Sequence, residues 1–493
     1  MTEIALVGGR VIDPESGLDA VRTVAIDDGL IEAVTADHVR AERVVDVTGL
    51  VIAPGFIDLH SHAQTLAGAR LQAMDGVTTA LELESGSLPL DATYAAAERE
   101  GRPINFGFSA GWAHARLAVV AGLEPSDHAG ETPIEFFEEA QAHPRWNTVA
   151  SEDDLGRILT LIEHGLDRGG IGIGVLLGYA PLSDRGEFRA VATLAARRGV
   201  PVFVHSRTIS MQDPGSSLEG ARELIEVAEA TGAHLHICHL NSTSLRLIET
   251  IGREVRAARR RGVAVTTEAY PYGAGSTGIG ADFFAPERLE RLGVPVTAIT
   301  YLPTGERVAS LERLAELRRI DPGGLCVFDF LDLGDPGDFR LLRESLALEG
   351  GVIASDAMPL TIRSGRRITG EWPVPDEAMT HPRSAGTFAR TLRWLVRETG
   401  VFALGEALER MSLAPARILE TSVPAMRNKG RLRPGADADL VVFDPATVTD
   451  EATFERLAPS SGIVHVLVGG RFVVADGELD VASNPGRAVR AGS

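Results

Sequence analysis

The sequence predicts an α/β protein, on the evidence of its middle and of its two ends. From about residue 55 to 420, short apolar runs typical of buried strands alternate with amphipathic stretches typical of helices. The two ends are instead rich in short strands and turns and poor in helix. We therefore expect a (β/α)8 TIM-like barrel with a small β-sandwich domain built from both chain ends.

The ends are expected to pair into one composite domain. Near the start of the chain, strand candidates flank an Asp28-Gly29 turn, which is a hairpin signal. Near the other end, the segment Arg431–Asp444 is typical of a turn followed by a buried strand. We expect residues 1–54 plus 425–493 to form the β-sandwich.

The barrel is expected over residues 55–424, with an insertion at about 278–350, where the pattern is less regular. Its strand candidates are Thr78–Glu84, Ile104–Phe108, Ile171–Leu177, Val202–His205, Leu235–His239, Val263–Glu268 and Gly351–Ser355. Helical periodicity is clear in Arg189–Arg198, Ala221–Thr231 and Ser244–Arg261.

Composition and charge exclude several classes of protein. The net charge is −20, from 48 basic and 68 acidic residues, and no basic tract occurs, so we expect no nucleic-acid partner. No apolar run approaches the ~18 residues of a membrane span, and the first residues lack the pattern of a signal peptide. Two cysteines cannot make a disulfide framework, and we expect a cytoplasmic location. A homo-oligomer is left open.

Polar side chains stand where the predicted strands end, which is the catalytic face of such a barrel. His60 and His62 close the first strand two residues apart, so their imidazoles can point to one face. His205, His239 and Asp356 close later strands in the same way. Each histidine alone would be an ordinary buried histidine, but their repetition at successive strand ends favours a metal site.

Two acidic residues, Glu82 and Glu84, lie on one face of the second strand, where an inward carboxylate is costly unless it is paired or metal-bound. Glu84 is nearer the strand end and is the expected ligand, while Glu82 is expected either to support it or to face a neighbouring arginine. The expected metal ligands are His60, His62, Glu84, His205, His239 and Asp356, a set that suits one or two Zn²⁺ ions. His234 and His236 compete with His239, and Cys238 is expected to point away from it.

Three motifs carry a resemblance to a known family: Pro54–His62, Gly76–Thr79 and Gly430–Asp444. With them the chain resembles the amidohydrolase superfamily, the urease-like metal-dependent hydrolases. Within that superfamily, segments such as Ile171–Tyr179 and Ala269–Thr277 resemble the N-acyl-D-amino-acid deacylases, of the D-aminoacylase and N-acyl-D-glutamate deacylase types.

The chain departs from these relatives at two places. Many superfamily members bridge two metals with a carboxylated lysine, but the single lysine here is Lys429, beyond the last catalytic strand. This argues against hydantoinase- and dihydroorotase-type sites. The deacylases usually have a cysteine ligand after the second strand, where this chain has Leu83-Glu84-Ser85. Glu84 is therefore expected to replace that cysteine.

The resemblance implies hydrolysis of the amide bond of an N-acyl-D-amino acid, N-acyl-D-glutamate being one candidate. Zinc lowers the pKa of a coordinated water to roughly 7, and Asp356 would act as general base and then general acid. The resemblance also implies that Tyr179, Tyr270, Ser276 and Arg383 bind the substrate. A further hypothesis is that the substrate has a second carboxylate on its side chain, which would bind Arg207, Arg366 and Arg367.

Two other functions remain open from the sequence. One is a different amidohydrolase acting on a cyclic amide or a dipeptide. The other is a non-catalytic relative that keeps the barrel as a scaffold. The retention of four histidines and Asp356 argues against this second function.

Overall fold

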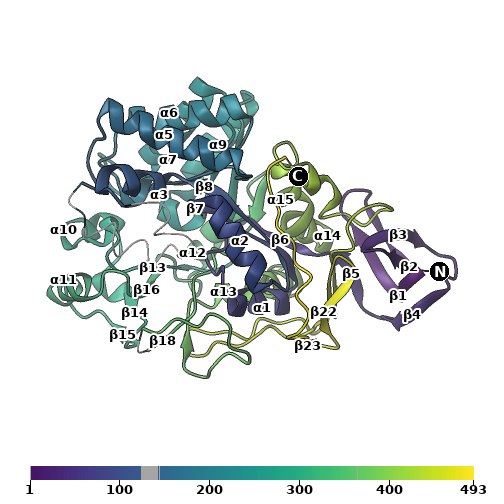
Figure 1. Cartoon of the computed structure of the whole chain (residues 1–493). Coiled ribbons are helices and arrows are strands. Elements are labelled where there is room, and N and C mark those ends of the chain that lie inside the picture. Colours follow the sequence, from purple (N-terminus) through teal and green to yellow (C-terminus); the bar gives the residue numbers. More distant parts are fainter. Residues whose placement is uncertain (1, 124–142, 144, 364, 493) are drawn as a thin grey trace.

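The predicted barrel is confirmed. The computed structural model describes residues 2–123, 143, 145–363 and 365–492. Eight strands pair in parallel, in the spatial order β17-β12-β11-β10-β9-β8-β7-β6 (Figure 1). Their bounds are β6 Phe56–Asp58, β7 Val77–Ser87, β8 Asn105–Gly111, β9 Ile173–Leu176, β10 Val202–His205, β11 Leu235–Ile237, β12 Val265–Ala269 and β17 Gly351–Ile353.

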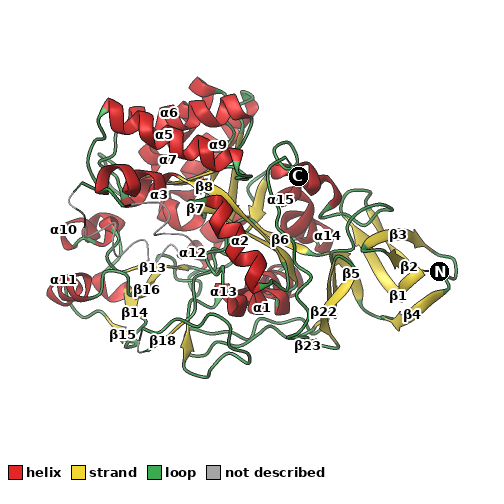
Figure 2. Ribbon diagram, viewed as in Figure 1, coloured by secondary structure: helices red, strands yellow, loops and turns green. Residues whose placement is uncertain are grey.

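Helices connect consecutive strands and cover the outside of the barrel (Figure 2). The principal ones are α1 Leu66–Met74, α2 Leu90–Glu100, α5 Glu152–Asp167, α6 Arg185–Arg198, α7 Ser217–Thr231, α9 Ile248–Arg260, α12 Pro336–Leu346 and α13 Arg383–Arg390. Their apolar faces pack on outward strand residues such as Val204 and Ile237. Among the described residues, no helix is both long and apolar enough to cross a membrane.

A buried carboxylate joins the first and last strands of the barrel, β6 and β17. Asp58 is fully buried and accepts hydrogen bonds from the backbone N–H of Ser355 at 2.9 Å and from Gln72 Nε2 at 2.7 Å. The Ser355 hydroxyl and the His60 backbone N–H donate to it as well. Just beyond, the His62 N–H donates to the carbonyl of Ala357 at 2.8 Å. Asp58 thus holds the residues that precede His60 and Asp356 side by side.

Both chain ends contribute to one mixed sheet of nine strands, seen at the right of Figure 1. Its strands are β1 Thr2–Asp13, β2 Leu18–Asp27, β3 Leu30–Thr35, β4 Ala41–Asp46, β5 Val51–Pro54, β20 Leu440–Phe443, β21 Ile463–Val468, β22 Arg471–Ala475 and β23 Glu478–Leu479. In its middle β5 pairs with β20, and β5 leads through Gly55 directly into β6. A Cβ at Gly55 would lie 2.2 Å from the Thr78 side chain, so this tight passage requires glycine. The domain limits 1–54 plus 425–493 remain a prediction.

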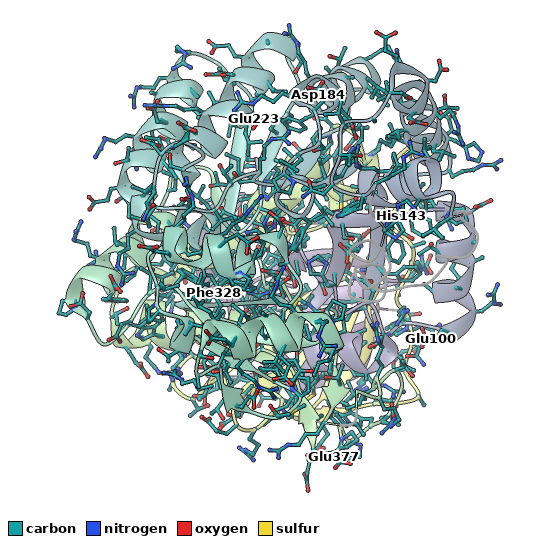
Figure 3. The ribbon with its side chains drawn as sticks, turned by 90° about the vertical axis from the view of Figure 1, so that its left-hand side faces the viewer. Glu100, His143, Asp184, Glu223, Phe328 and Glu377 are labelled. Atoms are coloured by element: carbon teal, nitrogen blue, oxygen red, sulfur yellow. The ribbon has the colours of Figure 1, made fainter. Side chains whose placement is uncertain are left out.

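The irregular stretch after β12 carries a small four-stranded sheet and two helices. The strands are β13 Ala274–Gly278, β14 Ile299–Tyr301, β15 Glu306–Arg307 and β16 Leu325–Asp329, and the helices are α10 Pro286–Leu289 and α11 Leu311–Ile320. Figure 3 looks onto this face of the molecule, with Phe328 labelled near its middle. This segment brings aromatic residues to the cavity described below.

The hydrogen bonds that Asp58 makes between β6 and β17 predict that loss of its carboxylate destabilises the fold. Asp58→Ala would leave several buried donors without an acceptor, and we expect it to lower the free energy of unfolding by roughly 3 kcal/mol. Urea denaturation checks this, with the exposed Asp27→Ala as control, expected within about 0.5 kcal/mol of wild type. Equal stability of the two variants would contradict the role given to Asp58.

Candidate metal centre

The six expected metal ligands converge at the C-terminal ends of the barrel strands. His60 and His62 follow β6, Glu84 lies in β7, and His205 ends β10. His239 and Asp356 stand just beyond β11 and β17. Both have a positive φ, 29° and 50°, a conformation that costs a non-glycine residue about 1–3 kcal/mol and is commonest at functional sites.

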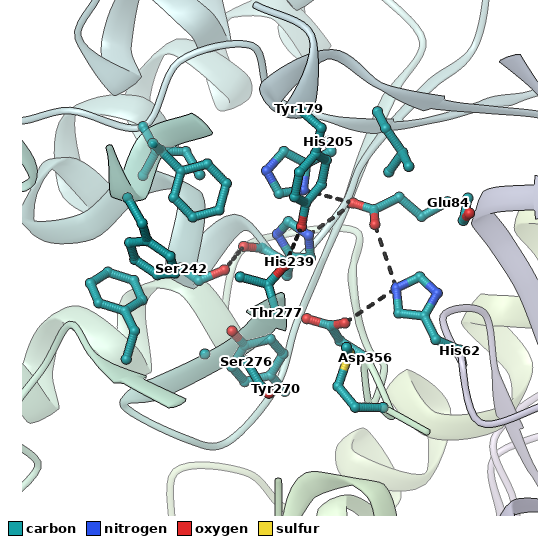
Figure 4. A pocket seen from close by; sticks show the side chains of 18 residues that line it. His62, Glu84, Tyr179, His205, His239, Ser242, Tyr270, Ser276, Thr277 and Asp356 are labelled. Carbon is teal, nitrogen blue, oxygen red and sulfur yellow. Dashed lines mark hydrogen bonds and ion pairs between the residues drawn. The ribbon is translucent and has the colours of Figure 1, made fainter. Parts of the chain in front are cut away.

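Glu84 lies at the middle of the cluster and contacts its two halves with different oxygens (Figure 4). Its Oε1 is 2.8 Å from His239 Nε2 and 3.2 Å from His205 Nδ1. Its Oε2 is 3.3 Å from His60 Nε2 and 3.6 Å from His62 Nε2. One carboxylate therefore connects the His205/His239 pair with the His60/His62 pair.

Asp356 completes the second half of the cluster. Its Oδ1 lies 3.5 Å from His60 Nε2 and 3.6 Å from His62 Nε2. Its Oδ2 is 2.8 Å from Arg383 Nη2, and Arg383 Nε donates to the Asp356 carbonyl at 2.6 Å. Arg383 thereby fixes Asp356 in its left-handed conformation.

Two further carboxylates stand behind the histidines. His62 Nδ1 is 2.7 Å from Glu82 Oε2, and His60 Nδ1 is hydrogen-bonded to Glu268 Oε1. A carboxylate accepts, so each Nδ1 carries a proton and each Nε2 is the ring atom that faces the cluster. This arrangement is the usual support of a metal-ligating histidine.

The buried charges shift one another strongly. Burial alone would lower the pKa of His60, but Glu268, Glu84 and Asp356 raise it well above the usual range. Burial likewise opposes the charge on His62, yet Glu82 raises the pKa of His62 to about 9. Burial raises the pKa of Glu84, but His60, His239 and His205 hold it well below the usual range. The negative charge of these carboxylates therefore favours the binding of a cation at the cluster, either a proton or a metal ion.

The residues fit a metal ion. Two groups of described residues at the cluster, His60/Glu84/His239 and His60/His62/Asp356, have ligand atoms within 4.8 Å of one another. Zinc with tetrahedral ligands at about 2.0–2.1 Å has ligand atoms roughly 3.4 Å apart, close to the 2.8–3.6 Å distances around Glu84. His205 Nε2 and His239 Nδ1 are buried without a hydrogen-bond partner.

The expected substrate-binding residues lie around one cavity beside this cluster. Tyr179, Tyr270 and Ser276 line it, together with His62, Glu84, His205, His239 and Asp356 (Figure 4). The Tyr270 hydroxyl and Ser276 Oγ have no hydrogen-bond partner, and the Tyr179 hydroxyl lies 3.0 Å from Thr277 Oγ1. Arg383 is buried behind this wall, 4.6 Å from the centre of the Tyr270 ring, and its Nη1 has no partner.

The cavity also has an apolar lining, formed by Leu176, Ile209, Phe283, Phe284, Phe328 and Met358. Among the described residues that line it, none is an arginine or a lysine. Arg207 is bound to Glu223 at 2.9 Å and lines a neighbouring cavity, while Arg366 pairs with Glu371 at the surface. Arg367 is not among the described residues that line this cavity either. That these three arginines bind a second carboxylate remains a prediction.

Sequence reasoning missed Glu268, although it ends the predicted strand Val263–Glu268 and obeys the same rule as the other site residues. His236, which the sequence offered as a competitor of His239 for the metal, instead places its Nε2 3.0 Å from Glu268 Oε2. The expectation that Cys238 points away from the site is wrong, because its thiol groups with His60 and Glu268. The amine of Lys429 donates to Asp437 and Asp439, so Lys429 takes no part in the cluster.

Comparison with known proteins agrees with this geometry. A model described as "Amidohydrolase family" matches residues 43–474, which is most of the chain. The chain belongs to the amidohydrolase family. It is thus a metal-dependent hydrolase that acts on amide bonds.

Among amidohydrolases, the chain is similar to two curated proteins of Alcaligenes xylosoxydans xylosoxydans. An N-acyl-D-glutamate deacylase is 27% identical, over 99% of this chain and 96% of the relative. A D-aminoacylase is 28% identical, over 95% and 93%. The fold matches that of an N-acyl-D-glutamate deacylase from Bordetella bronchiseptica, solved with zinc and a phosphonate inhibitor, with a TM-score of 0.75, 24% identity and coverage of 99% and 100%.

The raised pKa of His62 predicts a pH-dependent stability of this amidohydrolase in its metal-free state. With a folded pKa of about 9, against 6.5 for a free imidazole, the folded protein holds an extra proton between these values. The stabilisation is complete below about pH 6.5 and is lost as pH rises through 9. We expect the free energy of unfolding of chelator-treated protein to fall from pH 7 to pH 9 in urea titrations.

The Glu82→Gln variant supplies the control for this prediction. It lacks the carboxylate that raises the His62 pKa, so its stability should depend less on pH in the same range. Identical pH profiles for the two metal-free proteins would show that Glu82 does not hold a proton on His62.

Proposed function

We propose that this protein hydrolyses the amide bond of N-acyl-D-amino acids with zinc at the cluster around Glu84. The observation that carries the proposal is the carboxylate of Glu84, whose two oxygens face the two histidine pairs. Family membership and the deacylase relatives support an amide substrate. The relatives' names support the N-acyl-D-amino acid in particular.

The residues that would hold zinc fall into two sets that share Glu84. His60, His62 and Asp356 would hold one ion with Oε2 of Glu84, and His205 and His239 would hold a second with Oε1. Nitrogen and carboxylate ligands of this kind suit zinc. Bound there, zinc would supply Lewis-acid activation of a water molecule and of the amide carbonyl.

Asp356 has the position of a general base and acid. It is at the cavity wall, with Oδ1 toward the histidines and Oδ2 held by Arg383. It would accept a proton from the attacking water and deliver it to the amine nitrogen as the C–N bond breaks. The products are the carboxylate of the acyl group and the free D-amino acid.

One region beside the cavity has side chains that are chemically complementary to the carboxylate of the substrate. The hydroxyls of Tyr270 and Ser276 lack partners, and Arg383 lies directly behind them with a free Nη1. A guanidinium and hydroxyl donors together suit an α-carboxylate. Tyr179, on the same wall, would orient the acyl amide.

The apolar wall favours substrates with an apolar side chain or acyl group. Phe283, Phe284 and Phe328 belong to it, and Ile209 and Phe283 also line the neighbouring cavity that contains Arg207. Burying a side chain such as leucine is worth roughly 1.5–3 kcal/mol. An acidic side chain would meet no cation on this wall.

A chiral substrate panel tests the function. We expect hydrolysis of N-acetyl-D-leucine and N-acetyl-D-phenylalanine by the zinc-loaded protein, with kcat/KM about 10–100-fold above that for N-acetyl-D-glutamate. The L enantiomers serve as matched controls and should be poor substrates. Preference for a cyclic amide or a dipeptide, or no hydrolysis of any compound by a zinc-loaded protein, would overturn the proposal.

Substitution of Asp356 tests its role. Asp356→Asn keeps a carbonyl oxygen for the metal but cannot take up the proton, so kcat should fall by about 10²–10⁴-fold. Zinc content is measured on the same samples, and the exposed Asp27→Asn serves as control. An unchanged kcat in the zinc-loaded Asp356→Asn protein would exclude Asp356 as the proton carrier.

A further inference from the structure

We propose that Glu268, held in place by His236, is a positioning residue that orients both halves of the metal centre at once. Glu268 lies in β12, is 1% exposed and does not line the cavity. It is therefore not a ligand of the substrate. The inference depends on the metal centre proposed above, and not on the identity of the substrate.

A single oxygen of Glu268 contacts one candidate ligand from each half. Oε1 accepts the Nδ1–H of His60 and, at 3.1 Å, the backbone N–H of His239. The first contact fixes the ring of His60 so that Nε2 faces Glu84 Oε2 at 3.3 Å. The second fixes the backbone of His239 at its positive φ of 29°, with Nε2 of the ring 2.8 Å from Glu84 Oε1.

The other oxygen is held from behind by a chain of hydrogen bonds. His236 Nε2 lies 3.0 Å from Glu268 Oε2, and His236 Nδ1 lies 2.8 Å from Thr266 Oγ1. Thr266 Oγ1 is in turn 2.8 Å from Nε2 of the half-buried His234. Because an ionised carboxylate only accepts, His236 Nε2 must be a donor. Each oxygen of Glu268 thus has its own partner, and the carboxylate cannot turn away from the centre.

The charge of Glu268 agrees with this role. Burial raises its pKa, but His60 and His236 together hold the pKa below the usual range, so the group is an anion. The Glu268 carboxylate accepts from His60, His239 and His236 together. The sequence contains a matched comparison in Glu82, whose Oε2 is 2.7 Å from His62 and whose Oε1 accepts from the backbone N–H of Ser85. Glu82 contacts one candidate ligand of one half.

The experiment is a metal titration of the chelator-treated full chain, with zinc followed by calorimetry and Co²⁺ by absorbance. Wild type should bind two ions. Glu268→Gln should weaken both binding events by about 10–100-fold, since supporting partners of a metal ligand have effects of this size. Glu82→Gln should weaken only one of them. Thermal unfolding of each metal-free variant verifies that it is folded.

A second pair of variants separates positioning from a general packing effect. His236→Gln keeps an N–H that can donate to Glu268, and it should bind both ions within about threefold of wild type. His236→Leu fills similar space without a donor, and it should weaken both ions as Glu268→Gln does. A structural role alone would make the two His236 variants alike in metal affinity.

Several results would overturn the inference. They are wild-type affinity in Glu268→Gln, loss of only one ion in that variant, equal metal affinity of His236→Gln and His236→Leu, or binding of fewer than two ions by wild type. Two ions bound by a wild type that hydrolyses no N-acyl-D-amino acid would overturn the proposed function and leave the role of Glu268 standing.

Discussion

The structure depends on the neutralisation of carboxylates that are buried together at the mouth of the barrel. Glu82, Glu84, Glu268 and Asp356 are all less than a tenth exposed. A buried anion is unfavourable by several kcal/mol unless it is paired and hydrogen-bonded. Each of these four faces at least one imidazole, and the imidazoles of His60 and His62 attract protons when no metal is bound. A divalent cation would satisfy the same anions by displacing those protons.

Most of the backbone strain in this arrangement lies outside the barrel strands. His60, His239 and Asp356 lie just beyond the ends of the barrel strands. Two of them adopt a positive φ, at about 1–3 kcal/mol each. Glu268 holds the backbone of His239, and Arg383 holds both the side chain and the carbonyl of Asp356. The strain is thus local, and each strained residue has its own restraint.

The barrel and the convergence of the candidate ligands could be predicted because strand ends meet at one face whatever the connections between them. The predicted strand Val202–His205 has the bounds of β10, whereas Leu235–His239 ends two residues early, at Ile237. That difference explains the error at Cys238: the alternation of faces applies only within a strand, and His239 has left it. The pairing of Arg383 with Asp356 joins residues 27 positions apart through side chains, which no periodicity reveals.

The carboxylate of Glu84 affects what the proposed centre can hold. A thiolate presents one soft atom to both ions of a pair, whereas a carboxylate presents two hard oxygens that can each face a different set of ligands. Here the two oxygens do so, one toward His205 and His239 and one toward His60 and His62. Lys429, engaged with two aspartates, supplies no bridge of its own. The two halves of the proposed centre therefore both contact Glu84 in front and Glu268 behind.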